Sequence, residues 1–144
     1  MPSIAETFDL AVRNYQSGNL PQAEALCRQV VASEPAHAAA HHLLGILALS
    51  SGQPQAAIAL IRRSIELDPS NDDCHFNLGT ILMARREYAQ ARREFDRVVA
   101  LDPGNSRVQA SLAELDLQLR NYEESLAHAS EHSNSIPVKR DTAA

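Results

Sequence analysis

The fold is decided by residues 72–103, DDCHFNLGTILMARREYAQARREFDRVVALDP. Apolar residues recur there at spacings of three and four, which places them on one face of each of two helices. In the first half they are Cys74, Leu78, Ile81 and Leu82, and in the second half they are Tyr88, Ala91, Phe95, Val98 and Val99. The break near Arg86-Glu87 is so short that the two helices must fold back on each other. Asp102-Pro103 ends the second helix, because the residue before a proline is pushed out of the helical region.

The same pattern recurs along the chain with a period of 34 residues. The residues in register are the prolines Pro35, Pro69, Pro103 and Pro137, the leucines Leu10, Leu44, Leu78 and Leu112, and the alanines Ala23, Ala57 and Ala91. Gly45 and Gly79 follow two of these leucines, and Phe95 stands four residues after one of the alanines. Four periods in register indicate a chain built from repeated helical hairpins.

This pattern resembles the tetratricopeptide repeat family, and the resemblance covers about residues 3–137. It implies an all-α, right-handed solenoid of antiparallel helix pairs with about eight helices. We expect one domain over residues 3–133, with repeats at about 4–37, 38–71, 72–105 and 106–137, and a flexible tail at 134–144. The expected helices lie near residues 3–17, 21–34, 38–51, 54–67, 72–85, 88–101, 106–119 and 122–132.

Small residues at the repeat positions have a packing explanation. Glycine inside a helix costs about 1 kcal/mol relative to alanine, so Gly45 and Gly79 must be offset by close approach of the partner helix. The fourth repeat departs from this pattern, because Ser125, Ala129 and His132 replace its alanine, aromatic and next small residues. We interpret the helix at 122–132 as a terminal unit with a polar outer face. The alternative is a degenerate repeat that is covered by a further part of a longer parent protein.

Composition excludes several classes of protein. The 144 residues carry a net charge of −5 with mixed charges along the helices, so no basic stripe is available to bind nucleic acid. No apolar run is long enough to span a membrane, and the first residues lack the features of a signal peptide. We therefore expect a cytoplasmic protein, in which Cys27 and Cys74 are buried apolar side chains.

In the tetratricopeptide family the first helices of successive repeats line a concave groove. The resemblance assigns to this groove Phe8, Asp9, Val12, His42, Leu43, Ile46, Leu49, Asp73, Phe76, Asn77, Thr80, Met83, Ser111 and Glu114. These side chains are more apolar than a solvated helix face requires, and exposed apolar patches commonly mark binding sites. An amphipathic helix or an extended peptide of another protein is the expected guest.

Two known binding modes of the family do not match these residues. The positions of the clamp that holds a C-terminal carboxylate are Phe8, Val12, Leu43, Asp73 and Asn77, of which only Asn77 fits. Asp73 would repel a carboxylate. The asparagine ladder of the family's glycosyltransferases is likewise reduced to Asn77.

The sequence gives little sign of catalysis. It lacks the phosphate-binding, metalloprotease and serine hydrolase motifs, and we predict neither an enzyme nor a cofactor. His128 and His132 are four residues apart on a helix, but no third metal ligand is evident, so no metal site is predicted.

Three functional hypotheses are consistent with the sequence. The first, which we favour, is a non-catalytic module or scaffold that binds a peptide or helix of another protein. The second is the N-terminal, substrate-recruiting part of a larger bacterial glycosyltransferase, methyltransferase or sulfotransferase. The third is a self-assembly module in which one molecule's groove takes another's tail or terminal helix, with Ile136 and Val138 as the anchors of the tail.

Overall fold

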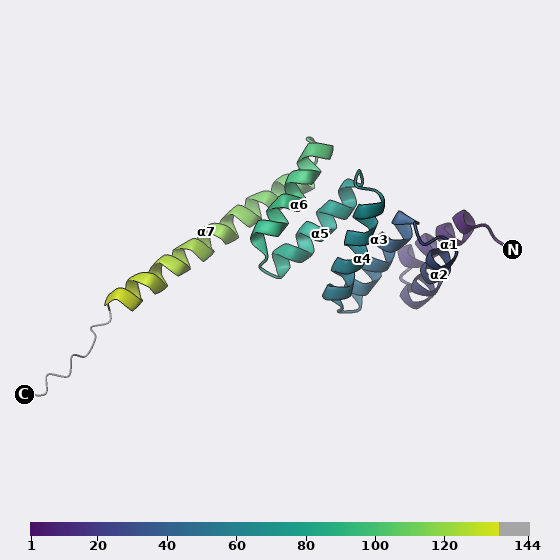
Figure 1. The fold of residues 1–144 in the computed structure, drawn as a ribbon, viewed down its shortest axis with the longest axis horizontal. Coiled ribbons are helices and arrows are strands. Elements are labelled where there is room, and N and C mark those ends of the chain that lie inside the picture. The colour runs from purple at the N-terminus through teal and green to yellow at the C-terminus, as the bar shows by residue number, and fades with distance from the viewer. Residues whose placement is uncertain (136–144) are drawn as a thin grey trace, which may run out of the picture.

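The computed structural model describes residues 1–135, and the side chains of residues 1–132. Within that range the chain forms helices and no strand. They are α1 (Ile4–Gln16), α2 (Leu20–Ser33), α3 (Ala38–Ser50), α4 (Pro54–Leu67), α5 (Asp72–Ala84), α6 (Tyr88–Leu101) and α7 (Ser106–Ser135). Helices α1 to α6 form three hairpins that stack along the molecule (Figure 1). The expected all-α solenoid is confirmed.

The turns inside the three hairpins share one backbone conformation. Gly18 and Gly52 have φ of 79° and 76°, where glycine avoids the clash that a Cβ atom causes. Arg86, at the equivalent place in the third hairpin, also has a positive φ of 62°. In each turn an amide bonds the carbonyl five residues earlier, which satisfies the end of the first helix. These pairs are Asn19 to Asn14, Gln53 to Ala48 and Glu87 to Leu82.

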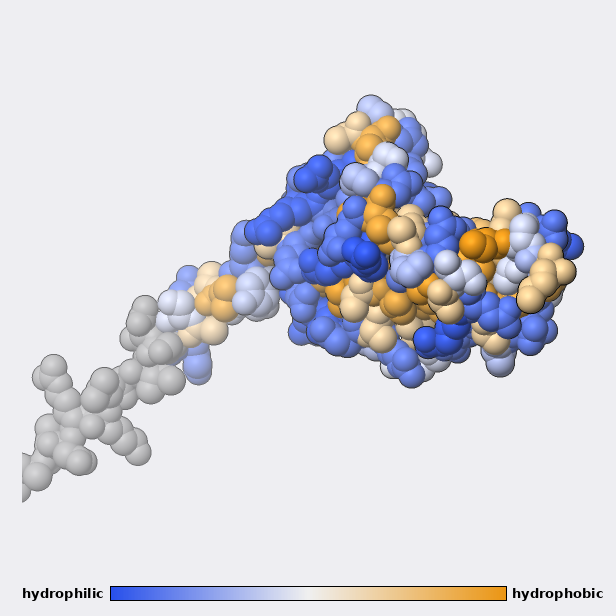
Figure 2. Space-filling view, turned by 45° about the vertical axis from the view of Figure 1, so that its right-hand side comes forward, coloured by the Kyte–Doolittle hydropathy of each residue, from blue (hydrophilic) through white to orange (hydrophobic). Residues whose placement is uncertain are grey.

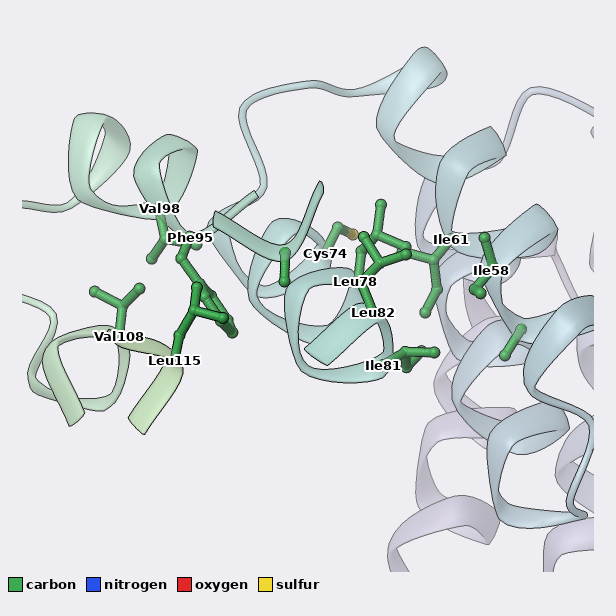
Figure 3. Close-up of a cluster of buried hydrophobic side chains, with 12 residues drawn as sticks. Ile58, Ile61, Cys74, Leu78, Ile81, Leu82, Phe95, Val98, Val108 and Leu115 are labelled. Atoms are coloured by element: carbon green, nitrogen blue, oxygen red, sulfur yellow. The ribbon is translucent and has the colours of Figure 1, made fainter. Parts of the chain in front are cut away.

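The core consists of two clusters of buried apolar side chains. One lies mainly between α1, α2 and α3, and the other extends from α4 to α7. Figure 3 shows that Phe95 and Val98 of the larger cluster lie beside Val108 and Leu115 of α7. The chain therefore has a continuous stack in which each hairpin covers the next.

Close approach explains the two helical glycines. A Cβ atom at Gly45 would lie 2.6 Å from Cγ1 of Ile61, and one at Gly79 would lie 2.6 Å from Cε1 of Phe95. Both distances are far below van der Waals contact, so only glycine lets the two helices of these hairpins approach so closely.

The fourth repeat differs from the expectation. The helices expected at 106–119 and 122–132 are one continuous helix, α7, whose far end projects from the stack (Figure 1). Arg120 stands where Gly18, Gly52 and Arg86 make their turns. A non-glycine residue in the left-handed conformation costs roughly 1–2 kcal/mol. After Arg86 the fully buried Phe95 offsets that cost, whereas the equivalent residue after Arg120 is only an alanine.

Two of the repeat leucines are less buried than Leu44 and Leu78, which are core residues. Leu10 is 43% exposed, because the described chain has no helix ahead of α1 to cover it. Leu112 is half-buried and packs against the larger cluster, in which Val108 and Leu115 are the fully buried residues of α7. The structure places Asn134 and Ser135 in α7, whereas Pro137, Ile136, Val138 and the rest of the expected tail lie outside the described residues.

Candidate partner-binding groove

The side chains expected in the groove come from α1, α3, α5 and the first part of α7, and we call them the groove face. The structure leaves five of them exposed: Asp9, Leu49, Asp73, Thr80 and Glu114. Eight are half-buried: Phe8, Val12, His42, Ile46, Phe76, Asn77, Met83 and Ser111. Leu43 is only 7% exposed and packs in the smaller core cluster, so it cannot contact a partner directly.

The N-terminal part of the groove face is mainly apolar. Phe8 and Val12 pack against the smaller cluster. The ring of Phe8 also lies 4.8 Å from that of His37, between their centroids. His37 caps α3, since its Nδ1 accepts from the amide of Ala40 at 3.1 Å. Phe8 therefore links α1 to the start of the next hairpin.

A hydrogen bond between His42 and Asn77 joins α3 to α5. Nδ2 of Asn77 lies 2.9 Å from Nε2 of His42. An amide nitrogen only donates, so Nε2 of His42 must accept and the ring is neutral. Burial lowers the pKa of His42, and the nearby Asp73 raises it by a smaller amount. The lowered pKa therefore favours the neutral ring, and this is the form that can accept the hydrogen bond from Asn77.

Arg107 completes a cluster at the centre of the groove face. Its guanidinium pairs with Asp73 at 2.8 Å and lies over the ring of Phe76, 4.5 Å from the centroid. The other neighbour of Phe76 is Phe95, at 5.9 Å between ring centroids. Phe76 is thus held between a cation and the core and is less available to a guest than its sequence position predicts.

Sequence reasoning missed Arg107. The available signal was its spacing, because it stands 34 residues after Asp73 and carries the opposite charge. Side chains at equivalent places of adjacent repeats lie side by side in a solenoid, so opposite charges at this spacing favour an ion pair. Exposed pairs of this kind contribute about 0–1 kcal/mol and serve mainly to orient side chains.

A hollow opens where α5 meets α7. Its volume is about 310 Å³, and it is lined by Thr80, Met83, Ala84, Arg86, Tyr88, Glu114 and Gln118. Three of these residues, Thr80, Met83 and Glu114, belong to the groove face. Figure 2 shows apolar side chains at the surface of the stacked hairpins, bordered by hydrophilic ones. The face therefore combines apolar contact area with a few polar groups, as binding surfaces commonly do.

His75 and His41 have structural roles, because each holds a carbonyl of the preceding turn. Nε2 of His75 meets the carbonyl of Pro69 at 3.0 Å, and its Nδ1 meets Glu94 at 2.8 Å. His41, one repeat earlier, bonds the carbonyl of Pro35, but its buried Nδ1 has no hydrogen-bond partner.

Burial also determines the state of the two thiols. It raises the pKa of Cys27 to about 11 and raises that of Cys74, so both stay protonated and are poor nucleophiles. Among the described residues no three histidine, cysteine or acidic side chains are grouped so that they could hold a metal ion. The described helices include none with the length and apolar character needed to cross a membrane.

Together, the stacked hairpins and the groove face define a helical-repeat protein of the protein-interaction class. Two family profiles described as tetratricopeptide repeat match the chain, one over residues 8–72 and the other over residues 48–115 and 82–137. The chain belongs to the tetratricopeptide repeat family, whose repeats are generally non-catalytic interaction modules. The comparison with curated proteins gives no match.

Solved structures of other proteins share the fold. The first tetratricopeptide domain of Spaghetti, bound to an HSP90 peptide, has a TM-score of 0.77 and 14% identity, covering 81% of this chain and 93% of that one. The translocator chaperone SycD of Yersinia enterocolitica has a TM-score of 0.75 and 19% identity, covering 81% and 86%. A mutant O-GlcNAc transferase of Thermobaculum terrenum has a TM-score of 0.71 and 28% identity, covering 80% of this chain but 23% of that protein.

Proposed function

We propose that the groove face holds a peptide or an amphipathic helix of another protein without covalent chemistry. The observation that carries this proposal is the row of incompletely buried apolar side chains along successive first helices. They are Phe8 and Val12 on α1, Ile46 and Leu49 on α3, and Met83 on α5. An amphipathic guest with apolar anchors would remove this surface from water, at about 25 cal/mol per Å².

The polar groups of the groove face indicate which kind of guest it accepts. The clamp positions hold Asp73, already paired with Arg107, and the buried Leu43. The free carboxylate of a chain terminus would find no cation left for it there, because the charge of Arg107 is already paired with Asp73. Internal segments with apolar anchors are therefore better guests than free acidic chain ends, and better than acidic peptides such as the HSP90 peptide SRMEEVD that is bound to Spaghetti.

The test is affinity capture with variants that alter only exposed groove residues. Leu49→Glu and Thr80→Glu place charge on α3 and α5 at exposed positions, so the fold should be retained. Arg93→Glu on α6 is the matched control, because it changes charge on an exposed residue away from the groove face. The proposal predicts that both groove variants lose the partner and that Arg93→Glu keeps it. Equal capture by all three variants would contradict it.

Two other substitutions are poor probes of binding. Phe76→Glu would break the contacts with Arg107 and Phe95, so its effect would mix folding with binding. Arg92 on α6 pairs with Asp116 of α7, so Arg92→Glu would disturb the packing between these helices.

A second candidate function is substrate recruitment within a larger enzyme. It is favoured by the 28% identity to the Thermobaculum terrenum O-GlcNAc transferase, in which the matching segment is 23% of the protein. The asparagine ladder does not support a shared substrate mode, because the amide of Asn77 is already bonded to His42. The test is the reading frame of the source genome, which must continue beyond Ala144 into a transferase domain. A stop codon at that point would exclude this function.

A further inference from the structure

A hollow of about 700 Å³ lies between the start of α6 and the middle of α7. Pockets that hold ligands commonly measure about 300–1,000 Å³. Tyr88 and Tyr122 both line the hollow, and their rings meet edge to edge at 6.5 Å between centroids. The lining has one arginine and no acidic side chain, and it consists of Arg86, Tyr88, Ala89, Gln118, Leu119, Asn121, Tyr122 and Ser125. The hollow is therefore cationic, although the net charge of the chain is −5.

Arg86 holds a backbone conformation that glycine holds in the other two hairpins. Its φ is 62°, and those of Gly18 and Gly52 are 79° and 76°. A positive φ is unfavourable for any residue with a Cβ atom, so glycine would suit this turn better than arginine. Strained residues that a protein retains are concentrated at functional sites. The turn itself does not require the side chain of Arg86, which is therefore a candidate for a binding role.

The guanidinium of Arg86 has no hydrogen-bond or ion-pair partner within residues 1–132. The acidic side chains on either side of it are engaged elsewhere. Glu87 pairs with Arg85 at 3.5 Å, and Glu114 accepts a hydrogen bond from Gln118 at 2.9 Å. The five N–H donors of Arg86 are therefore available to a ligand.

The first turn of α6 adds to the positive potential of the hollow. Helices α2 and α4 have a proline in this turn, Pro21 and Pro54. Helix α6 begins instead with Tyr88 and Ala89, which keep their amides, and its N-cap residue makes no side-chain hydrogen bond. Uncapped amides at a helix start favour a negatively charged group. Tyr88 and Ala89 line the hollow, so the helix start and Arg86 favour an anion at the same place.

The hollow borders the groove face. The smaller hollow of about 310 Å³ shares Arg86, Tyr88 and Gln118 with it. The smaller hollow is also lined by Thr80 and Met83, which belong to the groove face. A guest that packs an apolar side chain against Met83 can therefore continue past Arg86 into the larger hollow.

We propose that the larger hollow takes an acidic side chain of the guest, an internal Asp or Glu that Arg86 binds. The proposal rests on the function proposed for the groove face, because both concern the same guest. A carboxylate matches the donors of a guanidinium, and the rings of Tyr88 and Tyr122 suit an apolar neighbour of that acidic residue. The clamp positions offer no such site, because Arg107 is already paired with Asp73 there. The guest thus has one acidic residue beside its apolar anchors.

The first experiment selects peptides that bind the full chain. The probe is a phage library of random twelve-residue peptides fused to the N-terminus of a coat protein, so that no peptide has a free C-terminal carboxylate. The wild type and the control Arg93→Glu, an exposed position on α6, should select an acidic residue beside apolar ones. Arg86→Glu should select lysine or arginine at that place. The same preference for wild type and Arg86→Glu would overturn the proposal.

The second experiment measures the affinity of one selected peptide by fluorescence anisotropy. Changing its acidic residue to glutamine, or Arg86→Gly in the protein, should each weaken binding about fivefold, the most that an exposed ion pair contributes. The two changes together should weaken binding no further. Arg86→Gly should also raise the midpoint of urea unfolding, because glycine relieves the positive φ, so the weaker binding cannot arise from unfolding. Full affinity of Arg86→Gly would overturn the proposal.

Leu49→Glu separates this proposal from the function of the groove face. Selected peptides that lose affinity for Leu49→Glu but keep it for Arg86→Gly would overturn the role of Arg86 and leave the groove function standing. Selected peptides that bind Leu49→Glu as well as wild type would overturn both. A wild type that dimerises in sedimentation equilibrium, with Arg86→Glu monomeric, would assign the hollow to a second copy of the chain and also overturn the proposal.

Discussion

Substitution at Gly79 tests the close packing of the third hairpin. An alanine here gains about 1 kcal/mol of helix propensity. Its Cβ atom would lie 2.6, 2.8 and 3.1 Å from three ring carbons of Phe95, which is fully buried and has no space to move into. Overpacking of this kind costs about 1–3 kcal/mol. After the gain is subtracted from this cost, we expect Gly79→Ala to lower the free energy of unfolding by about 0–2 kcal/mol in total.

A double-mutant cycle with Phe95 separates the clash from other effects. Phe95→Cys reproduces the side chain of the first hairpin and should cost about 3–5 kcal/mol through the lost ring. In that background Gly79→Ala meets no ring and should stabilise the protein by about 1 kcal/mol. The coupling energy is then about 1–3 kcal/mol, measured by guanidinium unfolding followed with far-UV circular dichroism. Additive effects, or a Gly79→Ala variant more stable than wild type, would refute the reasoning.

Three further predictions concern the turns and the histidines. Arg86→Gly should raise the free energy of unfolding by about 1 kcal/mol, because glycine relieves the positive φ; an unchanged midpoint in urea would contradict this. Burial lowers the pKa of His42, so the unfolded chain binds more protons and stability should fall as pH drops below the ordinary value of about 6.5. His42→Gln, which keeps an acceptor for Asn77, should lose this part of the pH dependence in unfolding measured across that window. His75→Phe should cost about 1–3 kcal/mol and more than His41→Phe, because it breaks two hydrogen bonds where His41 makes one; equal losses on thermal unfolding would argue against this.

The repeated hairpins could be predicted from the sequence because their determinants are local. Apolar spacing, prolines and turn residues specify each helix within one period of the pattern. The glycines also carry long-range information, since a buried glycine in a helix requires a close neighbour. The sequence does not say which residue that neighbour is, and the structure shows that Phe95 lies against Gly79.

The continuous α7 could not be predicted, because its cause is not local. Arg86 makes a turn and Arg120 does not, although the same residue type stands at the same repeat position. The two positions differ in the residue that stands nine places later. The large Phe95 follows Arg86 and offsets the cost of the turn, whereas the small Ala129 follows Arg120 and does not. Only the balance between turn cost and distant packing decides which form is adopted.

The groove face was predicted in part. Its exposed apolar side chains can be deduced from the helix register, but their mutual contacts cannot. Two of these contacts depend on how adjacent hairpins stack. They are the hydrogen bond between His42 and Asn77 and the cation–π contact of Arg107 with Phe76. Such contacts across repeats depend on the rotation from one hairpin to the next, and that rotation cannot be deduced from the sequence of a single repeat.

The most direct test of partner binding on the groove face is photo-crosslinking in the native cell. A photoreactive amino acid would replace Thr80 at the centre of the groove face or Arg93 on α6, both exposed positions. The account predicts one protein crosslinked from Thr80 and lost when Leu49→Glu is added, with no such product from Arg93. A partner crosslinked from Arg93 and not from Thr80 would place binding on the other side of the stack and contradict the account.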